Sequence, residues 1–147
     1  MSKLKEIPAS HYDILEKKSF AHVACVMPNG LLANNTVAFN WDGKHLRFST
    51  LKARQKYKNF LNDSRCTVLI PDPENAWRYL EIRGHVEMAD DTNRSFINSI
   101  ARRYMEMDEY PYDQPGDERV TLTVVIDQVR AQYVHSDEGS PETIGIK

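Results

Sequence analysis

A cluster of basic side chains occupies the stretch "FSTLKARQKYKNF", residues 48–60. Its first part is typical of the end of a strand, and its second part predicts a helix beginning near residue 51 or 52. Four cations follow at alternate positions: Lys52, Arg54, Lys56 and Lys58. The amino terminus of a helix carries partial positive charge and favours Asp or Glu. The pattern therefore indicates either an anion site or a solvated basic face.

The residue types in this stretch suit a phosphate group. Ser49 and Thr50 offer hydroxyls, and the first N–H groups of a helix have no acceptor inside it. Arg54 presents a planar fork that can bind two phosphate oxygens, whereas Lys56 adds a point charge. The helix itself would face the core through Tyr57, Phe60 and Leu61.

A second polar feature is Asn35, which shares a face of a predicted strand with Ala33, Val37 and Phe39. An amide in such an apolar row is expected to be buried and to need partners. Two interpretations stay open, a structural hydrogen bond to a neighbouring loop and contact with a ligand.

No pattern indicates catalysis by the side chains alone. The five histidines lack metal-ligand spacing, and Cys25 and Cys66 lie in separate apolar runs, so no metal site is expected. Nucleophile-elbow, P-loop and dinucleotide-binding motifs are missing from the sequence. Either the chain binds an anion without chemistry, or a bound cofactor supplies the chemistry. Catalytic residues stay unassigned.

Composition narrows the class of protein. The 147 residues carry a net charge of -2, which argues against nucleic-acid binding. No apolar run has the length of a membrane helix, and the first residues lack the apolar segment of a signal peptide. A cytoplasmic protein with no nucleic-acid or membrane partner is expected.

The order of elements predicts a mainly β fold. Strands at 19–27, 31–41 and 44–50, joined by Asn-Gly and Asp-Gly turns, form a predicted meander. After the basic helix come strands at 65–70 and 76–88, an amphipathic helix within 90–107 and a strand at 119–126. A closed or split β-barrel of antiparallel strands with a few flanking helices fits this order. Residues 1–134 are expected to form one domain, with 135–147 as a tail that is mobile or packs on a partner subunit.

Three segments resemble the pyridoxamine-5'-phosphate-oxidase-like split-barrel superfamily of flavin and deazaflavin proteins. They are "FSTLKARQKYKNFLNDSRCTVLI", "DPENAWRYLEIRGHVE" and "ARRYMEMDEYPYDQPGDERVTL", and the likeness extends over about residues 10–129. The branch most similar uses the deazaflavin coenzyme F420.

This resemblance implies an FMN-binding type of split barrel, a homodimer with two cofactor sites at the subunit interface. Its phosphate anchors would be Thr50, Arg54 and Lys56, with Ser49 and Gln55 nearby. The segment Asn35, Thr36 and Val37 would lie along the ring system, and Trp77 and Tyr79 would border the pocket from the same or the other subunit.

The sequence departs from the family's usual second strand at three positions. Ala33 stands where Gln is common, Thr36 where Pro is common, and Ala38 where Trp is common. An Ala in place of a Trp opens space, so a wider substrate pocket or a shifted ring is expected. The phosphate end keeps its residues.

The function implied is a reductase that transfers hydride between coenzyme F420 and a small conjugated substrate. Two alternatives remain: an FMN-dependent oxidoreductase of the same superfamily, and a non-catalytic protein that binds a flavin or haem-type ligand. F420 also carries an anionic oligoglutamyl tail, for which Lys52 and Lys58 are candidate contacts.

Overall fold

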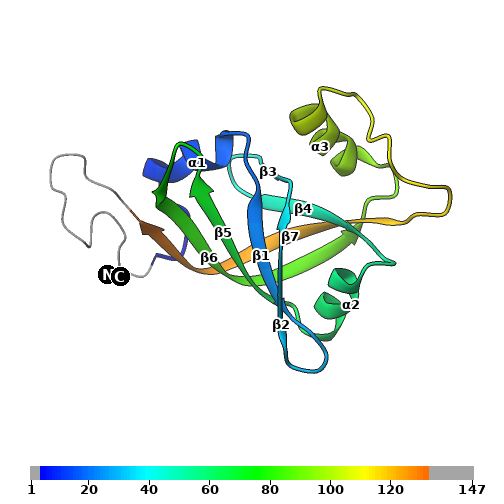
Figure 1. Cartoon of the computed structure of the whole chain (residues 1–147), viewed down its shortest axis with the longest axis horizontal. Coiled ribbons are helices and arrows are strands. Elements are labelled where there is room, and N and C mark those ends of the chain that lie inside the picture. The colour runs from blue at the N-terminus through cyan, green and yellow to red at the C-terminus, as the bar shows by residue number, and fades with distance from the viewer. Residues whose placement is uncertain (1–3, 133–147) are drawn as a thin grey trace, which may run out of the picture.

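The computed structural model describes residues 4–132, and the expectation for the tail 135–147 falls outside them. The strands in chain order are β1 (Ala21–Val26), β2 (Leu32–Val37), β3 (Phe39–Trp41), β4 (Leu46–Leu51), β5 (Arg65–Asp72), β6 (Asn75–Asp90) and β7 (Arg119–Gln132). The helices are a 3-10 turn (Ala9–His11), α1 (Tyr12–Glu16), α2 (Gln55–Asn62) and α3 (Ser95–Met105). Figure 1 shows α2 and α3 at one end of the sheet and α1 toward the other.

All seven strands form one antiparallel sheet in the order β2-β1-β5-β6-β7-β4-β3. Its two edge strands, β2 and β3, are consecutive in the chain and are separated only by Ala38. Because neighbouring Cα atoms lie about 3.8 Å apart, the two edges must meet at this residue. The sheet therefore curls on itself, and the predicted split β-barrel with flanking helices is confirmed.

The barrel interior is filled by alternate side chains of the strands. The largest completely buried ones include Phe39, Phe48, Leu46, Ile70, Leu80, Ile82 and Leu122. The longest strand pair, β6 with β7, is bent by a register shift next to Gly84. A Cβ at Gly84 would lie 1.9 Å from the carbonyl oxygen of Val125, so only glycine allows this close approach.

The predicted meander is correct in its hairpins and wrong in its middle strand. β1 pairs with β2 and β3 pairs with β4, but the second strand breaks at Ala38 into two strands on opposite sheet edges. The expected burial of Asn35 is also wrong, because β2 pairs only with β1 and extends beyond the core. Asn35 is exposed, and its amide donates to the carbonyl of Thr36.

The basic helix begins later than predicted, at Gln55. Leu51 still belongs to the sheet, where it pairs with Arg119 of β7, and Lys52 is in the turn that follows, with its N–H bonded to the Glu118 carbonyl. The predicted inward face of this helix is confirmed at Phe60, whose side chain is buried in the core. It is wrong at Leu61, which is 63% exposed because the helix ends one residue later, at the surface.

Helix α3 is fastened to the barrel by its two ends. At its start the Asp91 carboxylate accepts from the N–H groups of Phe96 and Ile97. Near its end the Arg103 guanidinium donates to three backbone carbonyls, those of Phe39, Leu15 and Lys17. The predicted amphipathic helix is confirmed, and its buried face is formed by Ile97, Ile100 and Ala101. Within residues 4–132, no helix has the length and apolar character to cross a membrane.

Candidate functional site: an anion pocket at the barrel seam

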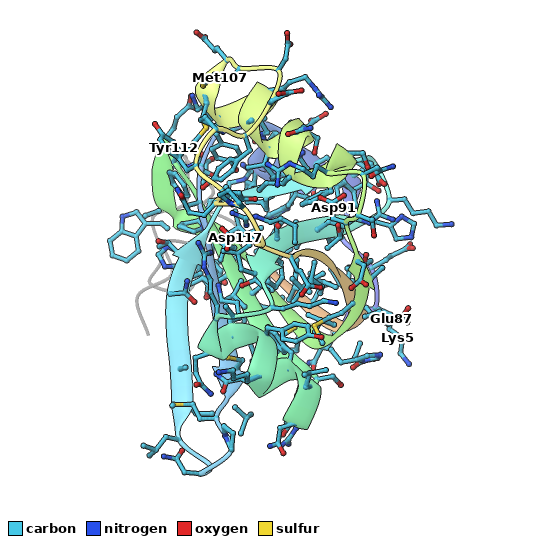
Figure 2. The ribbon with its side chains drawn as sticks, turned by 90° about the vertical axis from the view of Figure 1, so that its right-hand side faces the viewer. Lys5, Glu87, Asp91, Met107, Tyr112 and Asp117 are labelled. Carbon is cyan, nitrogen blue, oxygen red and sulfur yellow. The ribbon has the colours of Figure 1, made fainter. Side chains whose placement is uncertain are left out.

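A pocket of about 190 Å³ lies beside the edge strand β2 and the link at Ala38, where the two edges of the sheet meet. Its lining comes from β2 and Ala38, from β4, from the start of α2, from α3, from the loop that follows α3, and from the first residue of β7. The lining residues are Asn35, Thr36, Val37, Ala38, Ser49, Arg54, Lys56, Ile97, Ile100, Tyr110 and Arg119. In Figure 2, which views this end of the molecule, α3 and the loop bearing Tyr112 and Asp117 lie above α2. We call this space the seam pocket.

Two cations at the seam pocket lack a counter-ion. Arg54 is the N-cap residue of α2 and Lys56 lies in its first turn, and neither side chain forms an ion pair or hydrogen bond within residues 4–132. By contrast Lys52, which the sequence places in the same cluster, pairs with Asp90 at 3.1 Å and Glu118 at 3.3 Å. No side chain caps α2 either. Unpaired cations and uncapped N–H groups meet here and favour an anion.

Lys56 is unusual in its environment. Its Nζ lies 5.8 Å from the centre of the Phe48 ring, at the apolar end of the barrel. Loss of hydration by burial lowers the pKa of its ammonium from 10.5 to about 8. The neighbouring Arg54 charge lowers this pKa further, while the Cys25 sulfur opposes the shift. A partly desolvated ammonium without a partner gains more from an anion than a solvated one does.

The wall opposite Lys56 is built around Arg119, a residue that the sequence analysis did not find. Asp113 binds its guanidinium through both oxygens, at 2.8 and 2.6 Å. Arg119 also lies over the ring of Tyr110 and donates to the Ser49 hydroxyl at 3.3 Å. An Arg at the start of a strand gives no signal of such a role, because its partners come from a loop and from another strand.

Six of the ten predicted site residues line the seam pocket: Asn35, Thr36, Val37, Ser49, Arg54 and Lys56. Thr50 and Gln55 are adjacent in the chain but are turned away. Thr50 faces the core side of β4, where its buried hydroxyl has no hydrogen-bond partner among residues 4–132. Gln55 donates to the side chain of Asn59 within α2.

Comparison with known proteins places this geometry in a family. Residues 7–133 match the family described as pyridoxamine 5'-phosphate oxidase. The chain belongs to the pyridoxamine 5'-phosphate oxidase family. Comparison with curated proteins finds no match.

Solved structures agree with the family assignment. A structure titled "F420 Reductase" is 33% identical, with a TM-score of 0.74, and the match covers 84% of this chain and 98% of that one. A pyridoxamine 5'-phosphate oxidase-related, FMN-binding protein from Nostoc punctiforme is 17% identical, with a TM-score of 0.63 over 88% of this chain and 84% of that one. The General Stress Protein 26 from Bacillus anthracis is 17% identical, with a TM-score of 0.62 over 82% and 88% of the two chains. The last two, at 17% identity, show the fold alone.

Trp77 and Tyr79, the remaining two predicted residues, lie far from the seam pocket within one chain of this family member. Tyr79 pairs with Gln132 at the end of β7, whereas Thr50 pairs with Val120 at its start. The twelve-residue separation along β7 corresponds to roughly 40 Å of strand. Trp77 is 50% exposed there. These two aromatic residues could border a seam pocket only if it belonged to a second copy of the chain.

Two other cavities fit an anion less well. One, of about 390 Å³, lies on the outer face of the sheet around Ala24 and Thr67, and its two arginines, Arg65 and Arg83, already pair with carboxylates. The other, of about 190 Å³, is lined by four acidic residues and by three basic ones that already pair with carboxylates: Asp90, Asp91, Asp117, Glu118, Lys52, Arg94 and Arg119. Among these three cavities, the seam pocket has the two cations without counter-ions.

Proposed function

We propose that this family member is a reductase that binds coenzyme F420 and transfers hydride to a small conjugated substrate. The observation that carries the proposal is the pair of unpaired cations, Arg54 and Lys56, beside Ser49 in the seam pocket. Such a group of donors suits a phosphate ester. The 33% identity to a protein titled "F420 Reductase", across 98% of that chain, favours the deazaflavin.

The size of the seam pocket limits which part of the cofactor it can hold. At about 190 Å³ it is smaller than the roughly 300 Å³ at which pockets for drug-sized ligands begin. We expect it to take the phosphate and the adjoining chain, while the ring system extends along Asn35, Thr36 and Val37 of β2. That strand is largely exposed, so a single chain leaves the ring uncovered on one side.

A homodimer would complete the site, and this is the assembly that we propose. Large apolar side chains are exposed on or next to the strands β1, β2, β5 and β6: Phe20, Leu31, Leu32, Leu69 and Trp77. Exposed apolar groups of this kind indicate an interface. Pairing of two copies would also bring Trp77 and Tyr79 of one chain toward the seam pocket of the other. We place the protein in the cytoplasm, where the free thiols of Cys25 and Cys66 stay reduced.

In this proposal the cofactor and the side chains of the protein have different tasks. The cofactor supplies the hydride when bound, and the chain binds and orients it. Arg54, Lys56 and Ser49 fix the phosphate, and Thr50 supports the strand from the core side. Ala38, at the seam, leaves open the space that a larger residue would fill. No side chain is assigned to proton transfer.

FMN is the second candidate, because its phosphate would suit the same cations. The structural likeness to an FMN-binding protein supports only the fold. For the longer coenzyme, Lys52 is a poor contact for the oligoglutamyl tail, since Asp90 and Glu118 already compensate its charge. Lys58 is exposed on α2 and stays available.

Fluorescence titration of the purified protein with coenzyme F420 and with FMN tests the proposal. We expect F420 to bind more tightly, and Arg54→Ala and Lys56→Ala each to weaken binding about tenfold, as expected for loss of a charged hydrogen bond. Lys44→Ala, at an exposed lysine between β3 and β4 that does not line the seam pocket, is the matched control and is expected to change affinity less than twofold. Tight FMN binding without F420 binding would make the FMN alternative correct.

Turnover separates the reductase from a carrier. Oxidation of reduced F420, followed by absorbance, is measured with a panel of quinones and enones. Consumption of the reduced cofactor with at least one acceptor is expected. Binding without consumption across the panel would favour the non-catalytic alternative.

A further inference from the structure

Arg119 is a buried cation whose N–H donors are held in fixed directions by neighbouring side chains. Its side chain is 4% exposed, and that of its partner Asp113 is 7% exposed. Asp113 also accepts from Arg94 at 2.8 Å, so one carboxylate is shared by two guanidinium groups. The triad of two cations and one anion therefore keeps a net positive charge. Buried ion pairs of this kind hold their groups in one geometry.

The loop that carries Asp113 is fixed as well. Arg94 donates to the carbonyl of Tyr110, and the Tyr110 N–H donates to the side chain of Asn98 on α3. Tyr110 in turn lies 4.9 Å below the Arg119 guanidinium. The guanidinium is thus held from two sides, by a carboxylate and by an aromatic ring, next to the seam pocket.

The contact of Arg119 with Ser49 sets the direction of a hydroxyl. Nη1 of Arg119 donates to Ser49 Oγ at 3.3 Å, which occupies a lone pair of that oxygen. A serine hydroxyl has one proton to give, and Ser49 has no acceptor for it among residues 4–132. Ser49 lines the seam pocket. Its proton therefore stays available to an acceptor placed in the pocket.

We propose that Arg119 is a positioning residue for phosphate binding. By donating to Ser49 it keeps the serine hydroxyl as a donor toward an oxygen of a phosphate ester. The identity of the phosphate ester rests on the proposed function. The donor role of Ser49 and its dependence on Arg119 rest on the described contacts alone.

A double-mutant cycle tests this dependence. Affinities for the ribityl phosphate of the deazaflavin ring, which is coenzyme F420 without its tail, and for the same ribityl compound without the phosphate are measured in the wild type, Ser49→Ala, Arg119→Gln and the double variant. The dissociation constant of the phosphate-free compound, divided by that of the phosphorylated one, isolates the contribution of the phosphate to affinity. We expect each single variant to reduce this ratio about tenfold, and the double variant to reduce it no further, because Arg119 acts through Ser49.

Controls separate positioning from structure and from charge. Arg94→Gln disturbs the same carboxylate without touching Ser49 and is expected to leave the ratio within about twofold. Arg119→Lys keeps the charge but cannot bind Asp113 through two N–H groups while reaching Ser49, so it is expected not to restore the ratio. If Arg119→Gln unfolds with Asp113 unpaired, Arg119→Gln combined with Asp113→Asn replaces it.

A failure of the positioning role of Arg119 can be told apart from a failure of the proposed function. Fully additive losses in the double variant, or rescue by Arg119→Lys, would overturn the positioning role. If F420 does not bind at all, the proposed function fails, and the same cycle is run with inorganic phosphate by following the amide NMR shifts of Ser49 and Lys56. Loss of the phosphate-induced shift in Arg119→Gln is then expected, and an unchanged titration would refute the proposal.

Discussion

The pKa of Lys56 makes a quantitative prediction about anion affinity. In the free protein burial holds this pKa at about 8, below the ordinary value of 10.5. A bound phosphate stabilises the ammonium and returns its pKa toward or above the ordinary value. Affinity should therefore be constant below pH 7 and should fall as the pH rises through 8, when the free protein loses the proton that the complex requires.

The size of the effect follows from the two pKa values. At pH 9, one unit above the pKa of the free protein, the affinity should be about tenfold lower than at pH 7. If the bound pKa equals 10.5, the loss levels off at about 300-fold, the equivalent of 2.5 pKa units. The folding stability of the free protein changes in the opposite sense to the affinity. Between pH 8 and 10.5 the unfolded state binds more protons at Lys56 than the folded state, so the free energy of unfolding rises with pH.

Isothermal titration with coenzyme F420 from pH 6.5 to 9.5 measures the effect. Lys56→Arg is the decisive variant, since a guanidinium keeps its proton throughout this range and should give a flat profile. Lys58→Arg, on the exposed face of α2, should retain the wild-type profile. A wild-type affinity that does not fall between pH 7 and 9.5, or an equal fall in Lys56→Arg, would show that Lys56 does not hold the anion.

Three further predictions concern the frame around the site. Gly84→Ala should lower the free energy of unfolding by at least 1–3 kcal/mol, roughly the cost of overpacking, and by more than Gly43→Ala, where the added Cβ meets no neighbouring atom and only the backbone strain at a φ of +96° opposes the change; urea denaturation measures both. Arg103→Ala should cost about 2–4 kcal/mol, because three carbonyls lose their donor, and an equal stability in Arg103→Ala would contradict this role. The Arg78 guanidinium lowers the pKa of Asp13 to about 2, so this pair should stabilise the protein above pH 4 and lose that contribution toward pH 2; Asp13→Asn should remove this part of the acid dependence in thermal melts.

The sequence predicted the architecture well because turn residues and alternation mark hairpins. It failed at Ala38, since no local signal shows that a strand breaks where the two edges of a curled sheet meet. The same failure explains Asn35, whose burial was inferred from alternation alone. Alternation indicates which side chains share a face, but only the topology shows that β2 extends beyond the core.

At the site, the cluster of cations was predictable from local spacing, whereas the surrounding wall was not. Arg54 and Lys56 are two residues apart at the start of a helix, which is visible in the sequence. Arg119 comes to Ser49 from 70 residues away, through the pairing of β4 with β7. The later start of α2 was also hidden, because the long-range pairing of Leu51 with Arg119 overrides the local helical pattern.

The central claim is that the seam pocket holds the phosphate of a deazaflavin. A crystal structure of the chain with coenzyme F420 tests it most directly. We expect the phosphate within hydrogen-bonding distance of Ser49 and of the Lys56 ammonium, with the ring along β2. A phosphate bound instead in the outer-face cavity around Ala24 and Thr67 would contradict it.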